Sequence, residues 1–245
     1  MVLFLLIAFL LPLLSLALQA VIPISFIRFL LYGIEAASPS IAALALLLKC
    51  GTLRQFCREM FHRDKLALAV LLPIAAAGLP MLAAKLVFCA FCHTGFSLGS
   101  ISPEQFTIIA WALVAEELGW RGYLEPALKE KGLDRRVVPL LVGTVWGLWH
   151  YHYFLTGGVQ VPIALFFISC IIESYLYSFF MDCTGRNLVS VMIYHFAWNF
   201  FVHFFAVNPA GNQGSLWPYL ILILLEGALL AALHTAGRKN TLPRN

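Results

Sequence analysis

Apolar segments long enough to cross a membrane recur along the whole sequence, with short polar stretches between them. A helix of about 20 apolar residues spans the hydrocarbon core of a bilayer, which is roughly 30 Å thick. Inside that core a chain must satisfy its own backbone hydrogen bonds, which favours helices. The pattern predicts an all-α, polytopic integral membrane protein with about eight transmembrane helices. The predicted spans are residues 2–22, 25–48, 66–90, 105–128, 137–156, 161–181, 188–207 and 217–236.

Two predicted spans contain an internal proline. Pro39 and Pro73 should kink or interrupt their helices, because proline lacks a backbone N–H and clashes with the preceding turn. The first span is expected to be a retained helix rather than a cleaved signal peptide. No basic residue precedes it, and Leu18 stands where a small residue is wanted before cleavage after Ala20.

Composition supports this fold class and leaves no room for a soluble domain. The chain of 245 residues is 61% hydrophobic and 11% charged, far from the average of soluble proteins. Because no internal repeat or low-complexity linker divides it, we expect a single membrane domain over residues 1–245.

Basic residues are distributed unevenly between the loops. The loops around residues 91–103, 157–160 and 208–216 contain no lysine or arginine, and Arg28 is the one basic residue near their side of the membrane. Cytoplasmic loops gather positive charge, so both termini of this multi-pass cell-membrane protein are predicted to be cytoplasmic. The net charge of +4 follows from these loops and indicates a lipid bilayer rather than nucleic acid as the partner. The residues on the predicted cytoplasmic side are Lys49, Arg54, Arg58, Arg63, Lys65, Lys129, Lys131, Arg135, Arg136, Arg186, Arg238, Lys239 and Arg244.

Three charged residues lie in the middle of the fourth predicted span. Glu116, Glu117 and Arg121 each cost roughly 2.5 to 3.5 kcal/mol near the bilayer centre, so they need partners or a water-filled cavity. Residues four apart share a helix face, which pairs Glu117 with Arg121. Glu116 points about 100° away and is free to face a cavity as a base. A purely structural ion-pair network is the alternative.

Two further polar patterns lie on the fifth and seventh predicted spans. His150 follows an aromatic residue, Trp146, by four positions, while His152 is expected to be structural. His195 and Asn199 share a helix face and present two hydrogen-bond donors, which could stabilise an oxyanion. Membrane helices also use such residues to bind one another, at about 0.6 kcal/mol per contact, so this alternative stays open.

Together the three patterns resemble one family. The glutamate pair followed by arginine, the aromatic residue four positions before a histidine, and the histidine four positions before an asparagine resemble the CPBP intramembrane protease family, which includes CAAX prenyl endopeptidases. The resemblance covers about residues 104–206, the CPBP-like catalytic core, and residues 1–100 add N-terminal transmembrane helices. Trp146 stands where the family usually has phenylalanine.

The resemblance implies peptide-bond hydrolysis by a glutamate-activated water within the membrane. By position, Glu116 corresponds to the general base, Glu117 and Arg121 to its supporting pair, and His150 to a second group that holds the water. His195 and Asn199 correspond to the oxyanion donors. A membrane-associated protein or peptide is the expected substrate, prenylated or not. A transporter and a non-proteolytic membrane protein that binds a partner are the competing interpretations.

No cofactor is predicted, and two alternatives compete with this prediction. Glutamate and two histidines could hold a divalent metal such as zinc, but a metal-free site is favoured and the HExxH zinc pattern is absent. Cys89, Cys92 and His93 fit the haem-attachment pattern CxxCH, although a disulfide or free thiols are favoured. Four other ionisable residues lie within predicted spans and are candidates for a functional role or for pairing, although the sequence does not indicate their partners. They are Glu35, Lys85, Glu173 and Glu226.

Overall fold

The computed structural model describes residues 1–241 and the side chains of residues 1–233 and Thr235. These residues form helices and no strand, which confirms the all-α class. The predicted cytoplasmic residue Arg244 and the side chains of Arg238 and Lys239 lie outside this description. The elements are α1 (Val2–Val21), α2 (Ser25–Ala36), α3 (Ser38–Lys49), α4 (Leu53–Met60), α5 (Leu66–Cys92), α6 (Pro103–Ala115), η1 (Leu118–Leu124), α7 (Glu125–Glu130), α8 (Val137–Trp149), α9 (Tyr151–Thr156), α10 (Ile163–Cys183), α11 (Leu188–Phe204), η2 (Pro209–Asn212) and α12 (Trp217–Thr241).

Within residues 1–241, four helical segments are long and apolar enough to cross a membrane: α1, α5, α10 and residues Leu188–Asn212. The pair α2 and α3, bent by 66°, makes a fifth if it is counted as one span. The prediction of about eight spans is therefore not confirmed. The predicted spans 105–128 and 137–156 are divided into shorter helices, at Glu116 and at His150, and so fall below spanning length.

The two internal prolines have different effects on their helices. The break between α2 and α3 comes at Ala37, and Pro39 occupies the first turn of α3. Proline is tolerated in a first turn because its missing N–H would have no helical partner there. By contrast, α5 continues as one helix through Pro73 and Pro80, so Pro73 does not interrupt its helix, and a kink there stays a prediction.

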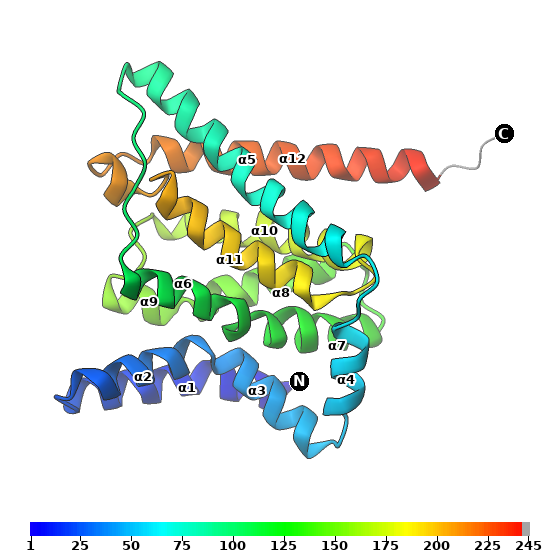
Figure 1. Ribbon diagram of the computed structural model, residues 1–245. Coiled ribbons are helices and arrows are strands. Elements are labelled where there is room, and N and C mark those ends of the chain that lie inside the picture. The colour runs from blue at the N-terminus through cyan, green and yellow to red at the C-terminus, as the bar shows by residue number, and fades with distance from the viewer. Residues whose placement is uncertain (242–245) are drawn as a thin grey trace.

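The N-terminal helices form a group below the remaining helices, drawn in blue in Figure 1. Small residues on α1 and α3, among them Ala8 and Ala42, are fully buried and allow close packing of these helices. Ser38 donates a hydrogen bond of 2.9 Å to the Ala8 carbonyl oxygen. The Trp149 indole N–H reaches the same carbonyl at 3.0 Å, so the N-terminal helices are joined to α8 by polar contacts as well as by packing.

The other helices pack around the aromatic part of the core. Helix α11 lies between α5 and α6, and α10 packs against α8 and α12 (Figure 1). Trp120, Tyr177 and Tyr194 are fully buried where these helices meet. This arrangement brings η1, α8 and α11, which carry the three sequence patterns, into one cluster.

Gly119 sets how closely η1 approaches α3. A Cβ atom at this position would lie 2.5 Å from the Pro39 carbonyl oxygen, closer than any side chain tolerates. The glycine thus allows the segment that follows the glutamate pair to rest directly on the start of α3.

Candidate active site

The glutamate pair lies where an α-helix changes into a wider helix. Ser102 caps α6 by accepting a hydrogen bond of 3.1 Å from the Gln105 backbone N–H, and Pro103 occupies its first turn. The α-helix ends at Ala115, and the π-helical segment η1 begins at Leu118. A π-helical turn re-aims the side chains around it and occurs often at functional sites.

Glu117 and Arg121 form the ion pair that their spacing predicts. Arg121 Nη1 lies 3.1 Å from Glu117 Oε2, and both side chains are 0% exposed. The guanidinium group also stacks on two aromatic rings, 3.9 Å from the Tyr177 centroid and 4.5 Å from the Trp146 centroid. Such cation–π contacts are strongest when the cation is removed from water. Arg121 is therefore fixed on several sides.

His195 lies between the two glutamates. Its Nδ1 atom is 2.7 Å from Glu117 Oε1, a hydrogen bond, and its Nε2 atom is 3.8 Å from Glu116 Oε1. Asn187 caps the helix that carries His195 by accepting from the Val189 backbone N–H at 3.2 Å. If Nδ1 donates to Glu117, a protonated imidazole directs its second N–H, at Nε2, toward the region in front of Glu116. Its positive charge would then face two carboxylates.

His150 occupies the break between α8 and α9. Its Nδ1 atom lies 2.7 Å from the Trp146 carbonyl oxygen, which can only accept a hydrogen bond. The proton of a neutral ring is therefore at Nδ1, and Nε2 is an acceptor. His150 is buried, and its ring lies 5.4 Å from that of Trp146.

Glu116 receives a short hydrogen bond that sequence reasoning missed. The Trp146 indole Nε1–H donates to Glu116 Oε2 at 2.6 Å, across two segments of the core. The residue type could have indicated this bond, because a buried tryptophan needs an acceptor for its N–H, whereas phenylalanine has no donor.

Asn199 lies one helical turn beyond His195 and is half-buried. Its side-chain Nδ2 donates a hydrogen bond of 3.1 Å to the His195 backbone carbonyl oxygen. One N–H of the Asn199 amide is thus used within α11. The other N–H would have to bind the oxyanion. His195 and Asn199 share a helix face, as their spacing predicts. That their side-chain N–H groups point to one position stays a prediction.

The remaining buried ionisable residues have partners that the sequence did not indicate. His152 Nδ1 lies 2.6 Å from Glu35 Oε1, and both side chains are buried. The other contacts are Lys85 Nζ donating to Asn212 Oδ1 at 2.9 Å, Ser169 Oγ to Glu173 Oε1 at 2.9 Å and Trp198 Nε1 to Glu226 Oε1 at 2.9 Å.

The structure places the side chains that the two cofactor alternatives involve. Among the described residues, no three histidine, cysteine, aspartate or glutamate side chains are grouped so that they could hold a metal ion. A metal-free reaction stays a prediction. All six cysteines are free, including Cys89, which is buried, and Cys92, which is exposed. Of the disulfide and the free thiols that the sequence favours for Cys89 and Cys92, the structure has the free thiols.

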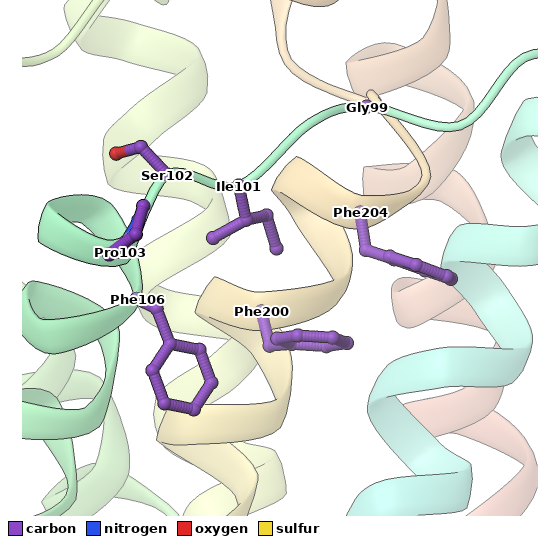
Figure 2. A pocket seen from close by; sticks show the side chains of 7 residues that line it. All are labelled: Gly99, Ile101, Ser102, Pro103, Phe106, Phe200 and Phe204. Carbon is purple, nitrogen blue, oxygen red and sulfur yellow. The ribbon is translucent and has the colours of Figure 1, made fainter.

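A separate apolar hollow lies beside the start of α6 and has a volume of about 420 Å³. Figure 2 shows Phe106 of α6 beside Phe200 of α11, with Ile101 of the preceding loop above them. A backbone hydrogen bond of 2.8 Å from Gly99 N–H to the Phe204 carbonyl oxygen holds the preceding loop against α11. No candidate site residue lines this hollow, although Phe200 directly follows Asn199.

Comparison with known proteins identifies this part of the chain. Residues 98–201 match the family model described as type II CAAX prenyl endopeptidase Rce1-like. The match extends from the loop before α6 to near the end of α11 and includes every candidate site residue. The resemblance to the CPBP and CAAX protease family is therefore confirmed over this segment. No curated protein matches the chain.

Proposed function

We propose that this membrane protein cleaves peptide bonds within the membrane by activating a water molecule at Glu116. The premise is the match of residues 98–201 to the Rce1-like CAAX endopeptidase family. The observation that carries the proposal is the pairing of a buried carboxylate and a buried imidazole without direct contact. Glu116 Oε1 and His195 Nε2 are 3.8 Å apart, longer than a hydrogen bond.

The division of roles between the glutamates follows from their contacts. Glu117 is bound to Arg121 and to His195, so its charge is already compensated and its position fixed. Glu116 keeps one carboxylate oxygen, Oε1, directed toward His195. A carboxylate in a buried site is suited to general-base catalysis when it lies within reach of the proton that it removes.

The reaction then proceeds in two steps. Glu116 takes a proton from water while the water oxygen forms a bond to the substrate carbonyl carbon, which produces a tetrahedral oxyanion. Protonated His195 and the free amide N–H of Asn199 donate hydrogen bonds to that oxyanion. The carbon–nitrogen bond breaks as the oxyanion returns to a carbonyl, and the proton held by Glu116 passes to the leaving nitrogen.

His150 has a supporting role in this scheme. With the proton of its neutral ring at Nδ1, it offers the Nε2 lone pair to the attacking water. Burial beside Trp146 limits its motion, so a water held there would keep its orientation.

The substrate class follows from the family and from the surroundings of the site. CAAX-type endopeptidases act on membrane-associated proteins, and the candidate site lies among apolar helices. We propose a membrane-associated protein or peptide as the substrate, cleaved by a multi-pass protein of the cell membrane with both termini in the cytoplasm. Contacts from Trp149 to α1 support a single membrane domain that includes the N-terminal helices.

The test compares the termini of membrane proteins in cells that express the wild-type protein or the Glu116→Gln variant. Glutamine keeps the size and hydrogen bonding of the side chain and removes the base. We expect at least one cleaved terminus to disappear in the variant while its abundance in the membrane is unchanged. Identical termini in both strains would contradict the proposal.

Metal dependence is measured separately with purified protein. Activity that persists after treatment with a strong zinc chelator, together with metal analysis, would support the metal-free reaction. Loss on chelation and recovery with added zinc would overturn that part of the proposal.

A further inference from the structure

Trp146 donates a hydrogen bond to Glu116 that the proposed mechanism does not use. We infer that Trp146 is a positioning residue, whose indole N–H tethers Glu116 and keeps this base from closing onto His195. The inference rests on the proposed function for its effect on catalysis, whereas the tether itself is a property of the fold.

Three distances carry the inference. Trp146 Nε1 lies 2.6 Å from Glu116 Oε2, while the other carboxylate oxygen is 3.8 Å from His195 Nε2. A protonated imidazole attracts a carboxylate and would form a hydrogen bond at about 2.7 to 2.9 Å if nothing opposed it. His195 cannot move freely toward Glu116, because its Nδ1 is bound to Glu117 at 2.7 Å. The bond from Trp146 holds the other carboxylate oxygen of Glu116, Oε2.

Trp146 is itself immobile enough to act as a tether. Its side chain is 4% exposed, and its ring contacts Tyr177 edge-on at a centroid distance of 5.8 Å. The Arg121 guanidinium group lies 4.5 Å from the ring centroid. Helix α8 cannot easily shift either, because a Cβ atom at Gly143 would lie 2.9 Å from the Cys170 carbonyl oxygen of α10. The indole N–H therefore has one fixed direction.

The tether leaves Oε1 of Glu116 free to take a proton. Without it, the carboxylate could rotate or close onto His195, and a direct ion pair would engage both the base and the oxyanion donor. Near-attack geometry is sensitive at this scale, since a misplacement of about 1 Å can cost roughly 100-fold in rate.

Phenylalanine is the substitution that tests the indole N–H of Trp146. Trp146→Phe keeps an aromatic ring beside Arg121 and Tyr177 and removes only the donor and part of the ring. We expect kcat on a fluorogenic peptide with a farnesylated CaaX terminus to fall about 10- to 100-fold with KM close to wild type, measured at a temperature at which the variant stays folded. A Trp146→Phe variant with wild-type kcat would overturn the positioning role.

The tether can be observed without any substrate. In protein labelled with ¹⁵N at its 6 tryptophans, the Trp146 indole signal is identified by its loss in Trp146→Phe. A short bond to a carboxylate places its proton far downfield. We expect the proton to move upfield in Glu116→Gln and farther in Glu116→Leu, since the acceptor is first weakened and then removed.

Trp198 provides the control within the same spectra. Its indole N–H donates to Glu226 at 2.9 Å, so its signal should respond to Glu226→Gln and not to substitutions of Glu116. A Trp146 signal that is unmoved in both Glu116 variants would overturn the tether. If the wild-type protein does not cleave the peptide, the proposed function loses support, and the spectra still decide the tether.

Discussion

Removal of Arg121 tests the buried ion pair on which the site is built. In Arg121→Met, the Glu117 carboxylate would remain at 0% exposure without its permanent cation and would keep only the hydrogen bond with His195. Breaking one side of a buried pair typically costs about 3 to 5 kcal/mol. At roughly 2 to 4 °C per kcal/mol for a chain of this size, the melting temperature should fall by about 6 to 20 °C.

A double variant separates the unpaired charge from the other losses. Glu117→Gln combined with Arg121→Met removes the carboxylate charge and keeps an amide oxygen to accept from His195 Nδ1. Most of the lost stability should therefore return, apart from about 2 kcal/mol from the stacking of Arg121 on Tyr177. Thermal unfolding of the purified proteins in detergent measures both effects.

Two results would refute this reasoning. Arg121→Met with a wild-type melting temperature would show that Glu117 does not need its cation. A double variant no more stable than the single one would show that the loss comes from packing rather than from an uncompensated charge. Arg121→Lys, which keeps the charge but not the planar group, should fall between wild type and Arg121→Met.

Further predictions concern the oxyanion site, the fold and the orientation. Asn199→Ala should lower kcat by about 100- to 1000-fold with little change in melting temperature, and a smaller effect on kcat would argue against an oxyanion role. Gly119→Ala should destabilise the protein by about 1 to 3 kcal/mol in thermal unfolding, whereas Gly95→Ala, with no atom within 4 Å of the added Cβ, should be neutral. In intact cells an impermeant maleimide should label exposed Cys92 but not exposed Cys50, and the opposite result would invert the predicted topology.

Local spacing explains what the sequence predicted about the site. The contact between Glu117 and Arg121 depends only on residues four apart on a helical segment, so it could be read directly. The apolar pattern likewise predicted helices in the right places, since most of the predicted ranges contain helices of the structure.

Contacts between distant segments could not be read in this way. Glu35 and His152 are 117 residues apart, and Trp146 and Glu116 are 30 apart. Which side chains meet at those separations depends on how whole helices pack, and one sequence does not fix that. The helix breaks at Glu116 and His150 were missed because apolar periodicity continues through them.

The attachment of α1 to the rest of the protein uses backbone atoms as acceptors. Trp149 and Tyr151 donate to the carbonyl oxygens of Ala8 and Phe9, at 3.0 and 2.7 Å. Because both acceptors are backbone atoms, these two hydrogen bonds do not depend on the side chains that α1 carries there, whereas the close packing around Ala8 still requires a small residue. A substitution of Phe9 that keeps the helix should therefore leave the bond from Tyr151 to α1 in place.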